Sequence, residues 1–275
     1  MTKKKIRVLC IDHEGGYGGS SRSLFYLIKN IIRLEDNIFF EVWCRKKGPI
    51  QDMYKSIKVK CITENNIQTY STLHRTTRNF FSFIKTIAYI IKKRKFILKS
   101  CAIINKKYDL VHFNHINLYL FAAALKLNTK IPFTFHVRTS LENLYEGNVE
   151  SLMAKKINKF FSYIFARIQL YTLLKISKGL IFISKNEKKS FENIMRRTNN
   201  GIVAYNIFEK NKITKKNLAL NKIKKFKILA LENYSWSRGT DRLIDVASEL
   251  RSMGESNYIF IIAGNMNLNS NQSKS

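Results

Sequence analysis

The sequence predicts an α/β protein whose first domain is a parallel sheet covered by helices on both faces. Short apolar runs rich in β-branched residues alternate with longer segments whose apolar residues recur at helical spacing. A glycine-rich loop joins the first apolar run to the first helical segment. The alternation pauses in a polar, basic stretch at 206–225 and then restarts. We therefore expect one complete domain of this kind and the first βαβ unit of a second.

The first strand is predicted at 6–11, and the loop Gly15–Ser21 separates it from a helix whose apolar stripe runs from Leu24 to Leu34. This strand, glycine loop and helix are typical of the opening of a Rossmann-like unit. Further strands of the first domain are predicted at 38–44, 57–62, 109–113, 131–137, 179–184 and 202–205. Further helices are predicted at 76–99, 118–127, 152–176 and 185–195. The second unit is predicted to hold strands at 226–231 and 258–263, with a helix at 240–253 between them.

These elements give four segments: a domain at 1–205, a linker at 206–225, an incomplete second domain at 226–265 and a polar tail at 266–275. A βαβ unit alone cannot bury both of its faces. Either the unit docks on the first domain as an added layer, or the chain is a truncated version of a longer protein. We favour truncation.

Charge is the unusual feature of the composition. The chain has 49 Lys and Arg against 19 Asp and Glu, a formal net charge of +30. This excess favours anionic partners: phosphorylated substrates, a membrane surface or nucleic acid. Because the bases are spread along the whole chain, nucleic acid is the least favoured of the three. Genomic base composition is an equally good explanation for part of the lysine content.

Two basic amphipathic segments, at about 78–99 and 152–176, offer a surface for anionic lipid. In the alternative interpretation their apolar stripes pack on the sheet and their lysines are simply solvated. No apolar stretch reaches the roughly 18 residues that span a bilayer, and the run at 6–11 is too short for a signal peptide. We expect a cytoplasmic protein that can lie peripherally on the inner face of the cell membrane. Its four cysteines form no C-x-x-C pair and are expected to be reduced, mostly buried thiols.

The glycine loop is the first candidate binding element. Its glycines allow backbone N–H groups to approach a phosphate or a sugar at the start of the following helix. A dinucleotide fingerprint is excluded, because Ser21 replaces the third glycine and the second strand ends in Cys44 and Arg45 with no carboxylate. The alternative is a tight structural turn in which Ser20 or Ser21 caps the helix.

Polar residues at the predicted strand ends form the second candidate. His136 ends a strand and Arg138 follows it, while His112 and His115 end another. In open α/β sheets ligands bind at the carboxyl ends of the strands, so His136 and Arg138 are placed to meet a hydroxyl or a phosphate. The alternative is a structural histidine. No metal site is predicted, since no further ligand stands at a suitable spacing.

The restarted segment holds a third candidate, the loop at 232–239. Arg238, close to the predicted helix start, is placed to clamp a diphosphate. A solvated loop is the alternative. Hydrolase, P-loop and zinc-protease motifs are absent from the sequence.

The sequence resembles family-4 glycosyltransferases. In order along the chain the resemblance is carried by the first strand with its glycine loop, Asp109–His112, Phe133–His136, Gly179–Ser184, Val203–Asn206, and Ile228–Asn233 through Arg238-Gly239. The resemblance implies a GT-B fold, in which two Rossmann-like domains enclose a cleft. It implies a nucleotide-sugar donor bound mainly by the second domain, an acceptor bound mainly by the first, retention of anomeric configuration, and neither metal nor cofactor.

Carried over residue by residue, the resemblance gives the candidate site. His136 would contact the transferring sugar and is the catalytic candidate. Arg238, where the family usually has a lysine before glycine, would bind the donor diphosphate, and Asn233 stands where Arg or Asn is common. The complete set of substrate- and phosphate-binding candidates is Gly15, Gly16, Gly18, Gly19, Ser20, Arg138, Asn206, Asn233, Arg238 and Gly239.

One departure limits the functional prediction. The family's paired-glutamate motif and its second glycine-rich loop, which bind the nucleotide and the sugar, are absent from this sequence. The preferred function is transfer of a sugar to a saccharide acceptor, expected to be lipid-linked, during surface polysaccharide assembly. A catalytically inactive remnant or binding module is the alternative, and whether this chain alone is an enzyme stays open.

Overall fold

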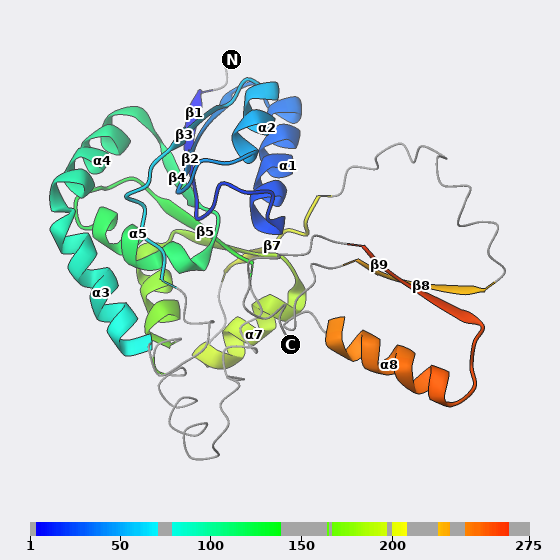
Figure 1. Cartoon of the computed structure of the whole chain (residues 1–275). Coiled ribbons are helices and arrows are strands. Elements are labelled where there is room, and N and C mark those ends of the chain that lie inside the picture. Colours follow the sequence, from blue (N-terminus) through cyan, green and yellow to red (C-terminus); the bar gives the residue numbers. More distant parts are fainter. Residues whose placement is uncertain are drawn as a thin grey trace. The chain divides into compact units, whose positions relative to one another are not determined.

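The computed structural model describes residues 4–70, 79–138, 164, 167–196, 200–207, 225–231 and 240–263. The chain divides into two compact units, Met1–Glu209 and Lys210–Ser275. Each unit is described by itself below (Figure 1).

The first unit is built on a sheet of seven parallel strands in the order β3-β2-β1-β4-β5-β6-β7. The chain runs from β1 outward to β3 and then returns to place β4 on the other side of β1. The strand order therefore reverses between β1 and β4, and such a reversal is where open α/β sheets bind their ligands. The strands are β1 Ile6–Asp12, β2 Ile38–Cys44, β3 Lys60–Thr63, β4 Leu110–Phe113, β5 Phe133–Val137, β6 Gly179–Phe182 and β7 Ile202–Val203.

Helices cover both faces of this sheet, with α1 and α2 on one side and α3, α4 and α5 on the other (Figure 1). Their bounds are α1 Gly19–Leu34, α2 Ile50–Ser56, α3 Asn79–Lys92, α4 Arg94–Lys107, the 3₁₀ turn η1 Ile116–Leu118, α5 Tyr119–Lys126 and α7 Lys185–Met195. Residues 167–176 are also helical.

The alternation of side chains along β1 divides the core in two. Val8 and Cys10 pack with residues of α1 and α2, whereas Leu9 and Ile11 pack with residues of α4 and α5. Successive side chains of a strand point to opposite faces, so a strand buried on both faces is apolar throughout. This is why the buried residues 8–11 of this strand are all apolar.

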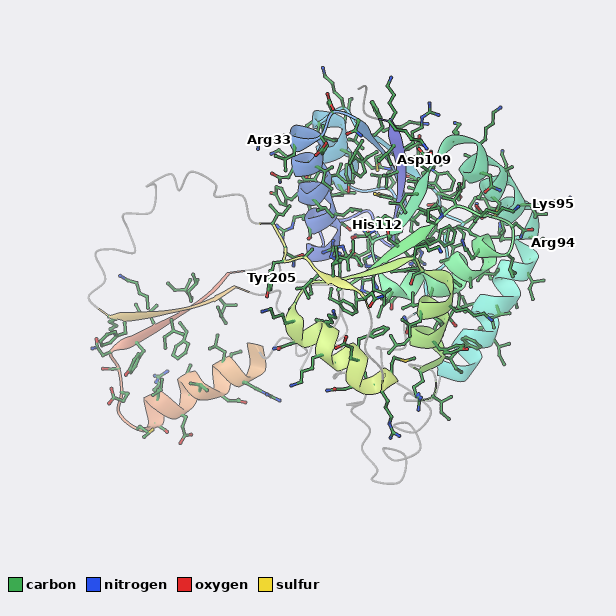
Figure 2. All side chains as sticks on the ribbon, turned by 180° about the vertical axis from the view of Figure 1, so that it is seen from behind. Arg33, Arg94, Lys95, Asp109, His112 and Tyr205 are labelled. Atoms are coloured by element: carbon green, nitrogen blue, oxygen red, sulfur yellow. The ribbon has the colours of Figure 1, made fainter. Side chains whose placement is uncertain are left out.

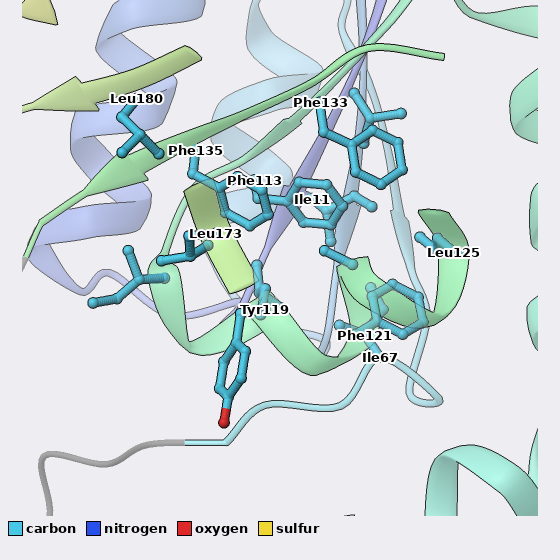
Figure 3. Close-up of a cluster of buried hydrophobic side chains, with 14 of the residues drawn as sticks. Ile11, Ile67, Phe113, Tyr119, Phe121, Leu125, Phe133, Phe135, Leu173 and Leu180 are labelled. Carbon is cyan, nitrogen blue, oxygen red and sulfur yellow. The ribbon is translucent and has the colours of Figure 1, made fainter. Parts of the chain in front are cut away.

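The larger half of the core is aromatic (Figure 3). The rings of Phe113 and Phe135 on neighbouring strands are stacked, with centroids 4.6 Å apart, and Phe133 meets Phe113 edge to face. Each such side chain is fully buried and contributes about 1.5–3 kcal/mol by burial. This packing fixes the positions at which β4 and β5 end.

Two predicted elements differ from the structure, and one helix was missed. Helix α2 was not predicted, because seven residues give too short a periodicity to recognise. The strand predicted at 57–62 starts later, at Lys60, since Lys58 turns the chain with a φ of 57°. The single helix predicted at 76–99 is two helices, α3 and α4, which are separated at Lys93 and extend to Lys107.

The second unit contains two parallel strands, β8 Phe226–Leu231 and β9 Tyr258–Ala263, joined through helix α8 Thr240–Ser252. Its apolar side chains are poorly covered: Leu229 is 57% exposed and Val246 51%. The tail predicted after residue 265 and most of the predicted linker lie outside the described residues.

Candidate functional site

The site lies at the carboxyl ends of β1, β4 and β5, where the strand order reverses. Each of these strands is mostly apolar and has polar residues at its end: Asp12 and His13 at β1, Asn114 and His115 after β4, and His136, the residue before the last of β5. We call the polar residues that meet here the strand-end cluster: Asp12, His13, Ser20, Ser23, His112, Asn114, His136, Arg138 and Asn206. His112 lies well inside the first unit (Figure 2).

Asp12 and Asn114 tie β1 to β4 and to the start of α1. The Asn114 amide donates to Asp12 Oδ1 (3.0 Å) and to the carbonyl of Ser20 (3.2 Å). Asp12 is fully buried. Burial alone would raise its pKa, but hydrogen bonds and charge from His13, with hydrogen bonds from Ser21 and Asn114, outweigh burial and lower the pKa below its usual value. The structure therefore keeps a carboxylate under the glycine loop.

Arg138 connects the remaining parts of the cluster. Its Nε donates to Asn114 Oδ1 (2.9 Å), and its Nη1 donates to Ser23 Oγ (2.8 Å) and to Asn206 Oδ1 (3.0 Å). Burial lowers the pKa of Arg138 to about 10, against the opposing effect of Asp12. The guanidinium is therefore still a cation at neutral pH, and most of its donors are already used within the protein.

His136 is held in one protonation state. Arg138 Nη2 donates to His136 Nδ1 (3.1 Å), so Nδ1 is an acceptor and the proton of the neutral ring is on Nε2. Burial, together with the charge of Arg138, lowers the pKa of His136 to about 2. Its Nε2 is buried and has no hydrogen-bond partner among the described residues. At neutral pH His136 is a hydrogen-bond donor rather than a general base.

His112 is the second buried histidine, and its ring meets that of His136 edge to face at 5.7 Å. Its Nδ1 is hydrogen-bonded to Thr134 Oγ1 (3.0 Å). Burial and the charge of Arg138 lower its pKa to about 3. At neutral pH His112 is therefore a second neutral ring of the cluster.

His13 and His115 form the other ring pair, with centroids 4.4 Å apart. His13 Nδ1 donates to Asp12 Oδ1 (3.1 Å), while His115 Nδ1 accepts from the backbone of Asn117 and caps η1. Sequence reasoning did not single out Asp12, His13, Ser23 or Asn114. Asp12 and His13 could have been found from the sequence, because they are polar residues at the end of an apolar run and directly precede the glycine loop.

The glycine loop is packed tightly on one side and open on the other. A Cβ on Gly15 would lie 1.9 Å from the carbonyl oxygen of Lys46, and one on Gly48 would lie 2.1 Å from that of Gly15. Two loops thus touch backbone to backbone, which only glycine permits. By contrast, a Cβ on Gly16 or Gly19 would meet nothing within 4 Å.

Helix α1 begins at Gly19 and has Gly18 as its N-cap, without a side-chain cap. The interpretation in which Ser20 or Ser21 caps the helix is therefore wrong, since both serines lie in its first turn. No acidic residue occupies that turn. The first N–H groups of a helix have no partner inside it and carry partial positive charge, so this helix start is suited to an anion or a polar sugar.

The structure brings together eight of the predicted site residues at one end of the sheet: Gly15, Gly16, Gly18, Gly19, Ser20, His136, Arg138 and Asn206. Asn233, Arg238 and Gly239 lie outside the described residues. Within the part of the chain that is described, no three His, Cys, Asp or Glu side chains are arranged to hold a metal ion. None of the described helices has the length and apolar character to cross a bilayer.

No protein-family model matches this chain, and no curated protein matches it either. Several solved structures do. HepE from Anabaena, solved with UDP and glucose, is 12% identical, with 94% of this chain and 70% of that chain covered and a TM-score of 0.53. The chain has a GT-B-like fold.

Two further structures share this GT-B-like fold. The α,α-trehalose 6-phosphate synthase from Burkholderia multivorans is 13% identical, with 98% of this chain and 67% of that chain covered and a TM-score of 0.59. The lipopolysaccharide outer core galactosyltransferase WaaB, in its apo form, is 12% identical, with coverage of 94% and 68% and a TM-score of 0.50. At such identities the likeness concerns the fold, and the function has to be argued from the site.

Proposed function

We propose that this protein is a nucleotide-sugar glycosyltransferase of the family-4 type. One observation carries the proposal: a neutral His136, whose free Nε2–H is buried beside a cationic Arg138 at the switch point of the sheet. A sugar nucleotide needs hydrogen-bond donors for its hydroxyls and positive potential for its phosphates. The strand-end cluster and the start of α1 supply both.

The chemistry follows from where charge develops. When the bond between the anomeric carbon and the diphosphate breaks, negative charge grows on the leaving oxygen. Fixed dipoles and cations aimed at that oxygen lower the barrier without a metal. In the proposal the N–H groups at the start of α1 meet a phosphate or the acceptor, and Arg238 neutralises the leaving diphosphate. His136 Nε2 donates to a hydroxyl of the transferring sugar, and the anomeric configuration is retained.

The acceptor proposed is a saccharide, lipid-linked, in the assembly of surface polysaccharide. Two observations support this acceptor. The fold is shared with a lipopolysaccharide outer core galactosyltransferase, and the net charge of +30 suits work beside anionic lipid. Peripheral attachment on the cytoplasmic face of the membrane belongs to the same proposal.

The test is a screen with UDP-, GDP- and ADP-sugars, run on this chain and on a version restored to a full donor-binding domain, in which hydrolysis and transfer are followed with and without EDTA. We expect the restored version to be active with one of these donors, insensitive to EDTA, and to give a product whose anomeric configuration is retained by NMR. Activity of this chain alone would overturn the expectation that it is truncated. H136Q is expected to lower kcat/KM at least tenfold. H112Q is the matched control, because it changes the same residue type at equal burial, and its activity should fall less.

The outcomes separate the proposal from its alternative. Saccharide binding by calorimetry without turnover of any donor would favour the binding module that keeps only acceptor recognition. An inverted product would overturn the family-4 mechanism while leaving transfer in place. Absence of both binding and turnover would reject the proposed function.

A further inference from the structure

Helices α3 and α4 form an outer layer of the first unit with an unusual surface. Three large apolar side chains are exposed there: Ile84 is 46% exposed, Ile91 68% and Leu98 42%. Figure 1 shows the two helices along one edge of the unit, and in Figure 2 Arg94 and Lys95 point away from it. Single exposed apolar side chains are normal on a protein surface, but several on one layer indicate an interaction surface.

The exposed residues follow a strict repeat. Ile84, Ile91 and Leu98 are seven residues apart, and each is followed by an exposed lysine, at Lys85, Lys92 and Lys99. A spacing of seven is two helical turns and returns to the same side of a helix. An apolar stripe and a lysine stripe therefore run side by side on α3, and α4 adds one exposed residue of each kind, Leu98 and Lys99. We call these six residues the α3–α4 face.

The charge of this layer has one sign. Every charged side chain between Asn79 and Lys107 is basic, and in the described part of the chain no acidic side chain pairs with Lys85, Lys92 or Lys99. A second copy of the chain, bound symmetrically through this face, would bring like charges together. Self-association through the face is therefore disfavoured.

Anionic lipid fits both stripes. Lysines meet headgroup phosphates, while Ile and Leu side chains beside them enter the boundary of the acyl chains. A nucleic acid would satisfy only the lysines, since aliphatic side chains find no partner along a phosphate backbone. We infer that the α3–α4 face docks the protein on an anionic membrane surface. This deepens the proposed function, on which it rests for its purpose, by naming the surface that would bring the enzyme to a lipid-linked acceptor.

The experiment is co-sedimentation of the full chain with vesicles of phosphatidylcholine, alone or mixed with phosphatidylglycerol. The wild type should sediment with the mixed vesicles and stay in the supernatant with vesicles of phosphatidylcholine alone. Each basic residue near an anionic surface contributes about fivefold to partitioning, so the triple variant K85Q/K92Q/K99Q should bind about a hundredfold more weakly. The variant I84S/I91S/L98S should lose the binding that persists at high salt, because salt screens the lysines alone.

The matched control is K4Q/K55Q/K189Q, which removes the same charge from exposed lysines outside the face. It should change binding by no more than about threefold, far less than the roughly hundredfold loss expected for the lysines of the face. All variants should have the same melting temperature as the wild type. Equal losses in the two lysine triples would overturn the proposal in favour of a diffuse charge effect. So would an unchanged I84S/I91S/L98S variant, or retention of the chain by duplex DNA but by no vesicle.

The readout involves no sugar transfer, which keeps the two proposals separable. Vesicle binding without turnover would reject the proposed function alone. Turnover with no vesicle binding would reject the docking face alone.

Discussion

The strand-end cluster and the α3–α4 face both contain cations, yet they use them in opposite ways. In the cluster, Arg138 is enclosed and bonded to Asn114, Ser23, Asn206 and His136. On the face, Lys85, Lys92 and Lys99 are exposed and lie in a segment without acids. An enclosed cation organises its surroundings and fixes protonation states, whereas an exposed one is available to an external anion. The difference predicts that changes in the cluster cost stability and changes on the face do not.

The largest effect is expected for R138A. The substitution removes a hydrogen bond from each of four partners, of which Asn114 and His136 are buried, and it removes a cation that interacts with the buried Asp12. Losing one partner of such a network costs about 3–4 kcal/mol. Urea unfolding should show this as a lower midpoint with an unchanged slope. R138K keeps the positive charge but lacks the several N–H donors of the guanidinium, so it should recover part of the lost stability. Equal stability of R138A and the wild type would contradict the account.

A smaller loss of about 2 kcal/mol is expected for G48A, because its Cβ would overlap the carbonyl of Gly15 at 2.1 Å. G16A is the control in the glycine loop that Gly48 touches, at a position where a Cβ meets nothing within 4 Å, and its unfolding free energy should change by only a few tenths of a kcal/mol. If G48A and G16A have the same melting temperature, the backbone contact between the glycine loop and the loop that contains Gly48 does not stabilise the protein.

The third effect is a dependence of stability on pH. The folded-state pKa of His136 (about 2) and of His112 (about 3) lie below the ordinary value of 6.5. The unfolded chain therefore binds more protons, so stability is complete above pH 6.5 and falls as the pH drops below it. The slope is up to about 1.4 kcal/mol per pH unit for each histidine.

Unfolding free energies measured between pH 7 and pH 4.5 test this, since the carboxylate of Asp12, with its lowered pKa, stays ionised over that range. H112Q/H136Q should flatten the profile. H13Q leaves both buried rings in place and should keep most of the slope. A wild-type profile that is flat down to pH 4.5 would show that the two histidines are not held neutral.

The smallest effect is expected on the face. K85Q, K92Q and K99Q remove exposed charges with no ion-pair partner among the described residues, and each should change stability by no more than about 0.5 kcal/mol. Slight stabilisation is the expected direction, because the chain carries a large net positive charge. A loss above about 1 kcal/mol would mean that these lysines have structural partners.

The sequence predicted much of this arrangement, because apolar runs and the polar residues that end them are local signals. The strand β1 and the strand end at His136 were placed correctly for that reason, whereas helix α1 begins at Gly19, within the loop predicted at Gly15–Ser21. The link of Asn114 to Asp12 and Ser20 was not foreseen, since it joins residues about a hundred positions apart. Short-range patterns carry no information on such pairs until the strand order is known.

The same limit explains the remaining errors. The break at Lys93 and the seven-residue helix α2 are set by tertiary packing rather than by periodicity. The role of Arg138 was predicted as phosphate binding, and the structure adds that its donors hold the cluster together. That role could not be read from Arg138 and its neighbours in the chain, because Ser23 and Asn206 come from distant segments.

The central claim is that Arg138 holds His136 as a neutral ring whose Nε2–H is available to a sugar. Nitrogen-15 NMR of the histidine side chains tests it directly. The account predicts a His136 with protonated Nε2 and unprotonated Nδ1 that does not titrate between pH 5 and pH 8, and whose Nε2 signal shifts when UDP-glucose or another sugar nucleotide is added. A ring that titrates near pH 6.5, or a signal that no UDP-, GDP- or ADP-sugar moves, would contradict it.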